Sequence, residues 1–247
     1  MRAGFAADVP RLSPDDRAAL AAYAARATWP AGFVIYQRGT PADGVFVVVR
    51  GRVVLRSRVR AGRGFVPGIA TAGETFGAEG LATNARYATD ARADEETETL
   101  HLSTARFRAF LREQPQRALA LIGQVMSERS ILLDRLRELT TMSVEQRLIA
   151  MLVRMARYDT FAGPDGRMVL TSPRYRLLCE LVGATRESVS LVLARLVGDG
   201  LVQRDGSTLI VEPAAKLAAR LDQSTPEHEL VLALTGDESA QPARALQ

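Results

Sequence analysis

Regularly spaced glycines in the first half of the chain limit its fold more than any other sequence feature. Between Gly32 and Gly77, glycines alternate with short runs of β-branched and aromatic residues. Such runs are typical of short strands joined by glycine turns. The runs cover residues 33–36, 45–49, 53–55 and 97–102. The pattern predicts an antiparallel β-roll or sandwich. A helix is expected before it, because Ser13 can act as N-cap with Pro14 in the first turn, and alanines continue to about Arg26.

The second half changes to helical periodicity. Residues 117–140 contain no proline and a single glycine, Gly123. About 24 helical residues span about 36 Å, which is longer than a small β-domain needs to cover itself. We therefore expect this helix to pair with its copy in a homodimer through apolar residues close to a heptad spacing. These are Leu121, Val125, Leu132, Leu136 and Leu139. A single buried helix would show the same stripe.

Composition narrows the class of protein. The chain has 247 residues, 47% of them hydrophobic, which suffices for one large or two modest domains. The single cysteine, Cys179, excludes an internal disulfide and a cysteine-rich metal site, and it favours a reducing cytoplasm. No run of about 18 apolar residues predicts a membrane span, and the N-terminus lacks the pattern of a secretory signal. We expect a cytoplasmic protein without a membrane partner.

The charge balance is compatible with nucleic-acid binding. The net charge is +4 at pH 7, and arginine supplies nearly all the basic residues because Lys216 is the only lysine. The planar guanidinium suits both phosphate and the edge of guanine. A biased genome composition would give the same excess of arginine, so this signal alone decides nothing.

Residues 175–197 carry the most informative pattern. Two helices with apolar faces flank Gly183, which supplies a sharp turn. Polar residues gather at the N-terminus of the second helix. In a recognition helix, the N-terminal residues enter the major groove. Asp205 and Gly206 then predict the two-residue turn of a hairpin, a wing. The candidate DNA contacts are Arg176, Thr185, Arg186, Glu187, Ser188, Ser190 and Arg204.

Each candidate suits a definite contact. Arg186 can bond guanine O6 and N7 together, and Glu187 can accept from cytosine N4. Arg176, Ser188 and Arg204 are expected mainly to hold phosphates. An ordinary helical pair with a solvated charged face is the alternative, but the order of helix, glycine turn, polar helix start and hairpin favours DNA binding.

Three segments resemble one family over about residues 15–215. They are residues 39–51 (GTPADGVFVVVRG), 73–81 (GETFGAEGL) and 183–190 (GATRESVS), of which the last is the most specific. The chain resembles the cyclic-AMP receptor protein and fumarate-nitrate-reduction regulator (CRP/FNR) superfamily. The resemblance implies a homodimer that binds double-stranded DNA and recruits or blocks RNA polymerase. It also implies an α+β fold: an N-terminal antiparallel β-roll of the double-stranded β-helix type, a long dimerisation helix and a C-terminal winged helix-turn-helix.

The resemblance also places a candidate effector pocket, and the pocket departs from the cyclic-AMP pattern. In members that bind cyclic AMP, glutamate directly follows the cassette glycine and an Arg-Ser pair grips the phosphate. Here Ala78 follows Gly77, and Tyr87 and Ala88 stand where Arg-Ser is expected. The candidate pocket comprises Gly77, Ala78, Glu79, Arg86, Tyr87, Ala88, Leu132 and Leu133. We expect that cyclic AMP is not the effector, and the sequence identifies no other effector.

The recognition helix also departs from the family, because Leu191 replaces an arginine that is common there.

The expected domain limits are a sensor roll at 1–115, a dimerisation helix at 116–142, a winged helix-turn-helix at 143–220 and an acidic tail at 221–247.

One cysteine cannot hold an iron–sulfur cluster, and neither His101 nor His228 is a persuasive haem ligand. No cofactor, metal or catalytic residue is expected. Two other classes compete with a DNA-binding regulator: a sensing module that acts on a protein partner, and a cupin-like metalloenzyme, for which two histidines are too few.

Overall fold

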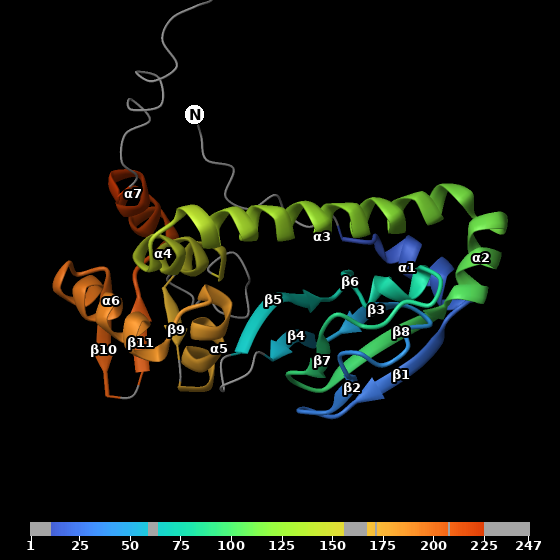
Figure 1. Cartoon of the computed structure of the whole chain (residues 1–247), viewed down its shortest axis with the longest axis horizontal. Helices are drawn as coiled ribbons and strands as arrows, with labels where there is room; N and C mark the ends of the chain where they lie inside the picture. Colours follow the sequence, from blue (N-terminus) through green and yellow to red (C-terminus); the bar gives the residue numbers. More distant parts are fainter. Residues whose placement is uncertain (1–10, 59–63, 156–166, 171, 207, 225–247) are drawn as a thin grey trace, which may run out of the picture.

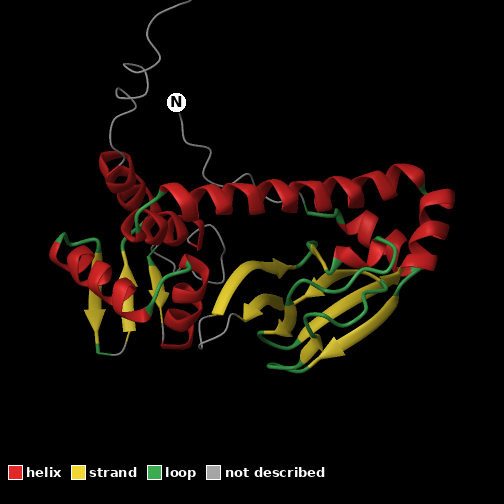
Figure 2. Cartoon of the chain, viewed as in Figure 1, coloured by secondary structure: helices red, strands yellow, loops and turns green. Residues whose placement is uncertain are grey.

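A computed structural model describes residues 11–58, 64–155, 167–170, 172–206 and 208–224, without the side chains of 172–174 and 222–224. A β-rich N-terminal domain and a smaller C-terminal domain lie along one side of a single long helix (Figure 1). Strands dominate the first domain and helices the second (Figure 2). The predicted combination of roll, long helix and winged helix-turn-helix is confirmed.

The N-terminal domain consists of two four-stranded antiparallel sheets. The first has the order β1 (Ala25–Trp29), β8 (Thr97–Ser103), β3 (Gly44–Arg50), β6 (Thr75–Phe76), and the second the order β2 (Val34–Tyr36), β7 (Asp90–Ala93), β4 (Arg52–Arg58), β5 (Gly64–Thr71). Strand β3 is buried on both faces, which explains its unbroken apolar run. Val45 and Val47 face the helices, whereas Phe46 and Val48 face an aromatic core.

Two glycines allow the short 3-10 helix η1 (Ala78–Leu81) to lie against β3. A Cβ atom on Gly80 would collide with the backbone nitrogen of Gly44, so the two backbones touch directly. This contact fixes the segment that begins the candidate effector pocket.

The first helix is shorter than predicted. Helix α1 spans Pro14–Ala21, and the hydroxyl of its N-cap Ser13 accepts a hydrogen bond from the Asp16 amide, as expected. The predicted extension to Arg26 is wrong, because Ala25 already pairs with His101 in the sheet. Alanine favours a helix locally, but pairing with β8 prevails over that preference.

The long helix α3 covers Pro115–Thr141 and follows the shorter α2 (Thr104–Glu113). Its 27 residues correspond to about 40 Å. Among the described residues, no helix is both long and apolar enough to cross a membrane.

The C-terminal domain is a winged helix-turn-helix. Its elements are α4 (Val144–Met155), β9 (Met168–Leu170), α5 (Ser172–Val182), α6 (Arg186–Gly198), β10 (Val202–Asp205), β11 (Thr208–Val211) and α7 (Ala214–Ser224). Gly183 adopts a positive φ of 66° in the turn between α5 and α6, as predicted. Asp205 pairs with Thr208 and belongs to β10, so it is not a turn residue as predicted, and Ser207 lies outside the described residues. Helix α7 runs past the expected domain limit at residue 220, and residues 225–247 of the expected tail lie outside the described residues.

Candidate nucleic-acid interface and effector pocket

Thr185 and Ser188 organise the start of α6. The Thr185 hydroxyl accepts a hydrogen bond from the Ser188 amide at 3.2 Å, and the two hydroxyls lie 3.0 Å apart. Both side chains are half-buried. The two hydroxyl groups that are expected to contact DNA therefore also take part in capping the helix. This capping fixes the direction of the first turn of α6.

Arg186, Glu187 and Ser190 are exposed at the same helix start. The Arg186 guanidinium carbon lies 5.7 Å from the centre of the Tyr175 ring, and the Tyr175 hydroxyl donates to the Arg186 carbonyl at 3.3 Å. The sequence analysis missed Tyr175, which orients the expected guanine-binding side chain from α5. The opposite face of α6 is buried, with Val189, Leu193 and Leu196 at most 1% exposed.

The expected phosphate contacts lie on neighbouring elements. Arg176 on α5 is 81% exposed at its side chain and pairs with Glu180, with Nε 3.5 Å from Oε1. Arg204 is exposed on β10, which packs beside α6 (Figure 1). Leu191 on α6 is 59% exposed, one helical turn after Glu187. The interface therefore presents arginines, the Glu187 carboxylate and the apolar side chain of Leu191 around the recognition helix.

Aromatic side chains fill the candidate effector pocket. The Tyr87 ring stacks on Tyr36 with centroids 3.7 Å apart and planes 9° from parallel. Phe46 and Phe76 continue the stack, with their centroids 4.9 Å apart. Tyr87 thus belongs to the core of the roll and is 5% exposed. It provides no cation where a phosphate group would need one.

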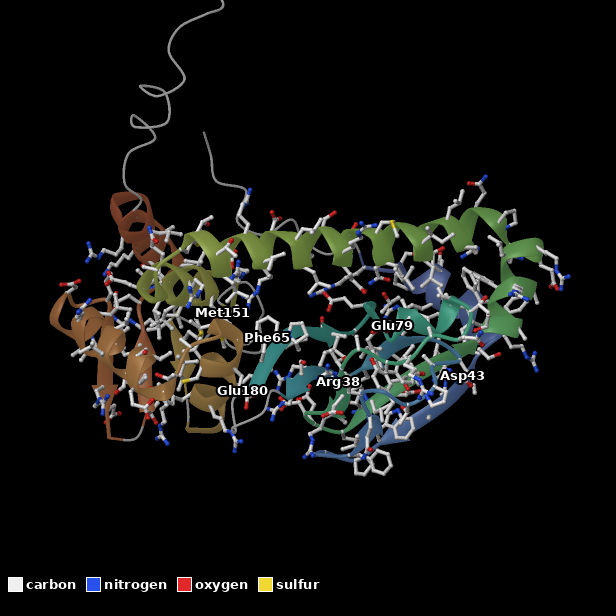
Figure 3. The ribbon with its side chains drawn as sticks, in the orientation of Figure 1. Arg38, Asp43, Phe65, Glu79, Met151 and Glu180 are labelled. Atoms are coloured by element: carbon white, nitrogen blue, oxygen red, sulfur yellow. The ribbon has the colours of Figure 1, made fainter. Side chains whose placement is uncertain are left out.

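Two carboxylates, those of Glu79 and Glu128, lie near this aromatic stack, and Figure 3 labels Glu79. Glu79 Oε1 accepts a hydrogen bond from the Ala88 amide at 3.1 Å, so a group of this chain already uses that donor. Glu128 extends from α3 and accepts from the Thr75 hydroxyl. Burial, together with the nearby charges of Glu74 and Glu79, raises the pKa of Glu128 to about 7. Among the described residues, neither Glu79 nor Glu128 forms an ion pair.

Three other expected members of the pocket are exposed. Arg86 donates to the Gly39 carbonyl at 2.6 Å and is exposed. Leu132 and Leu133 are 47% and 58% exposed, so within one chain they do not line the pocket as expected. Glu128, one turn before Leu132, instead contacts the roll from α3 through its hydrogen bond with Thr75. The sequence analysis did not include Glu128 in the candidate pocket.

The expected dimer face of α3 also needs correction. Leu121 is 0% exposed and packs in the core formed by the roll and α2, so it is not available to a partner. Leu139 is half-buried, and a Cβ atom on Gly183 would lie 3.0 Å from it, so it faces the DNA-binding domain. Val125 is half-buried. Only Leu132 and Leu136 of the predicted set are exposed.

A different set of α3 residues forms an exposed apolar stripe. Leu119, Met126 and Leu133 recur every seven residues and are each more than half exposed. Leu136 is 58% exposed and follows Leu133 by three positions, as in a heptad pattern. The pattern in the sequence therefore combines two apolar faces of one helix, one of which is buried within the chain.

Two family models match the chain in the order of the two domains. The model described as a cyclic nucleotide-binding domain matches residues 26–114, and the model described as a Crp-like helix-turn-helix domain matches residues 146–220. The chain belongs to the CRP/FNR superfamily of transcription regulators.

Relatives of the chain in this superfamily differ in their effectors. The cAMP-activated global transcriptional regulator Vfr of Pseudomonas aeruginosa is 28% identical over 214 residues, which cover 82% of this chain and 95% of Vfr. The CRP-like cAMP-activated regulator of Mycobacterium tuberculosis is 23% identical, covering 85% of this chain and 93% of that protein. The c-di-GMP responsive regulator CLP of Xanthomonas campestris shares the fold, with a TM-score of 0.70 at 22% identity over 81% of this chain and 99% of CLP.

The sensor domain also contains His101, and α5 contains the single cysteine, Cys179. His101 stacks on Phe46 with centroids 4.3 Å apart, and its Nε2 lies 3.3 Å from an Asp43 carboxylate oxygen. In the described part of the chain, no group of three or more histidine, cysteine, aspartate or glutamate side chains is placed to hold a metal ion. Cys179 is buried on α5, and burial raises the pKa of its thiol, which disfavours the reactive thiolate.

Proposed function

We propose that the chain acts as a homodimer that reads a palindromic duplex site through α6 and modulates RNA polymerase in the cytoplasm, without enzymatic activity. The observation that carries this proposal is the start of α6, where Thr185 caps the helix and Arg186 and Glu187 are exposed. Arginine there can bind guanine in two places, and glutamate can accept from cytosine.

Leu191 adds an apolar contact to this reading surface. Its exposed side chain lies one turn after Glu187 and suits the methyl group of thymine. Arg176 and Arg204 are proposed to hold phosphates beside the groove. In a two-fold dimer the recognition helices face successive major grooves, about 34 Å apart. By resemblance to the family, each half-site contains a TGA-like core.

The proposed dimer forms through the exposed stripe of α3. Leu119, Met126, Leu133 and Leu136 present apolar surface along several turns of this helix. Pairing two such helices would bury that surface and set the distance between the two recognition helices.

Cyclic AMP is proposed not to be the effector. Tyr87 is stacked in the core, and Glu79 brings a carboxylate to the Ala88 amide, in the segment where the family grips a phosphate. A second anion there would be repelled and would find no arginine. Calorimetry is expected to show no tight binding of cyclic AMP. Tight binding with a matching gain in DNA affinity would overturn this part of the proposal.

Selection of bound sequences from a random duplex pool tests the main proposal. We expect a palindrome whose half-sites lie about one helical turn apart. A pool that shows no enrichment would contradict DNA reading and favour the alternative, a sensing module that acts on a protein partner.

A further inference from the structure

Glu180 of α5 lies where the sensor domain touches the DNA-binding domain. The contact is made by strands β4 and β5, here called the flap. Arg56 of the flap pairs with Glu180, with Nη2 3.3 Å from Oε2. Gly64 lies against the same side chain, since a Cβ atom there would sit 3.3 Å from Glu180 Oε1. Figure 3 labels Phe65 of the flap and Glu180 at this junction.

The same carboxylate also holds a residue of the DNA interface. Arg176 Nε lies 3.5 Å from Glu180 Oε1, one helical turn away on α5. The exposed fractions of the side chains are 14% for Glu180, 29% for Arg56 and 81% for Arg176. One largely buried carboxylate is therefore shared between a cation of the sensor and a cation that faces solvent.

The contact between flap and α5 is incompletely satisfied. Arg56 Nε and Glu180 Oε2 are both buried and lack a hydrogen-bond partner among the described residues, although the two side chains form an ion pair. Buried polar atoms without partners oppose the stability of a contact. The position of Arg56 against Glu180 is accordingly set only weakly by this ion pair. It can change while the apolar contacts of Val54 and Val66 persist.

We propose that Glu180 couples the sensor flap to DNA binding by competing with DNA phosphate for Arg176. The inference rests on the proposed function, because it assigns a regulation to the phosphate contact of Arg176. A phosphate oxygen can replace the carboxylate as the partner of the guanidinium. When the flap presents Arg56, Glu180 has a second cation and releases Arg176 at lower cost. When the flap withdraws, Arg176 is the one cation left to Glu180 among these three residues.

This coupling is reciprocal. Whatever moves the flap changes the affinity for DNA, and DNA binding strengthens the contact of Glu180 with Arg56 by the same factor. Glu180 is thus a positioning residue. It acts on DNA binding through Arg176 and needs no contact of its own with DNA.

The signs of two substitutions test the inference. Glu180→Gln frees Arg176 and is expected to raise affinity for the selected duplex about two- to fivefold, the range of an exposed ion pair. Arg56→Gln is expected to lower affinity by a similar factor. In the Glu180→Gln background, Arg56→Gln is expected to have no effect. In an Arg176→Gln background, neither substitution is expected to change affinity.

A matched control separates this coupling from a general effect of charge. Asp205→Asn removes one negative charge from the wing, and any gain in affinity from it should persist in the Arg176→Gln background. The gain from Glu180→Gln should vanish there. Persistence of the Glu180→Gln gain without Arg176 would overturn the inference, as would unchanged affinity of Glu180→Gln.

Unfolding without DNA distinguishes this inference from the proposed function. A double-mutant cycle of Arg56 and Glu180 in denaturant should show a favourable coupling, and zero coupling would overturn the contact. Absence of duplex binding by the unmodified chain, with that coupling present, would instead overturn the proposed function.

Discussion

Glu128 is the residue through which the long helix and the sensor roll share a buried charge. Its carboxylate accepts a hydrogen bond from Thr75 of β6, and Glu74, Glu79 and Tyr36 are the ionisable groups that face it from the roll. Burial raises its pKa to about 7, and the Thr75 hydroxyl opposes part of that rise. The folded chain therefore keeps Glu128 mostly protonated above its ordinary pKa of 4.5 until the pH approaches about 7.

Glu128→Gln is expected to flatten the dependence of stability on pH. In the unfolded chain Glu128 loses its proton near its ordinary pKa of 4.5, whereas in the folded chain it keeps the proton until about 7. The free energy of unfolding consequently falls as pH rises between these values, by at most on the order of 3 kcal/mol, and is constant above them. Denaturant unfolding from pH 4 to 8 measures the slope. Glu95→Gln, at an exposed position, should keep the slope. Equal slopes for the Glu128 variant and the unmodified chain would contradict the assignment.

Arg186→Ala is expected to reduce specificity. Loss of a bidentate guanine contact should cost about 1–3 kcal/mol on the selected duplex and much less on a scrambled one. Arg204→Ala is the comparison, because loss of a phosphate contact should weaken both duplexes alike and reduce the salt slope by about one. Binding of both variants across a salt series measures this. An equal loss on both duplexes for Arg186→Ala would mean that α6 is not the reader.

At the scale of elements, the sequence predicted correctly the features that depend on interactions within a few residues. The helix-turn-helix follows from Gly183 and the Thr185 cap, whose effects are complete within a few residues. Strand β1 was missed because its pairing with β8 joins residues 68 to 76 positions apart. The same holds for the sites. The recognition helix was visible in sequence, but the Tyr36–Tyr87 stack and the contact of Arg56 with Glu180 exist only after distant segments meet.

Helix α3 shows this limit most clearly. Its existence and length follow from an uninterrupted helical pattern, but Leu121 and Leu119 are both leucines in that pattern. Leu121 is buried against the roll, whereas Leu119 is 56% exposed. The packing of the roll against α3 determines which apolar stripe of the helix stays exposed and available to a partner.

Leu136→Glu is expected to produce a folded monomer, because it places a charge without a partner in the proposed dimer face. Leu121→Ala should instead lower the free energy of unfolding by about 2–5 kcal/mol and leave the dimer intact. Sedimentation at micromolar concentration and denaturant unfolding measure the two effects. A monomeric mass for the unmodified chain would contradict the dimer, and dissociation by Leu121→Ala would contradict the assignment of faces.

At the scale of the whole molecule, the two domains share one apolar core. Val54 and Val66 of the flap belong to the same buried cluster as Leu178 and Leu181 of α5. Arg135 of α3 adds a polar link, since its guanidinium donates to the Leu181 carbonyl. Burial lowers the pKa of Arg135 to about 10, which keeps it charged at neutral pH. The sensor and the DNA-binding domain are therefore expected to unfold as one unit.

Val66→Ala is expected to separate the unfolding of the two domains. Val66 is 0% exposed in the shared core, and truncation there should cost about 2–3 kcal/mol of interdomain stability. Trp29, the single tryptophan, lies in β1 and reports on the roll, whereas far-ultraviolet circular dichroism follows mainly the helices. In the unmodified chain both signals should change together in denaturant. In Val66→Ala the helical signal should fall first. Val45→Ala, also 0% exposed but inside the roll, should shift both signals together. Separate transitions in the unmodified chain would show that the shared core does not couple the domains.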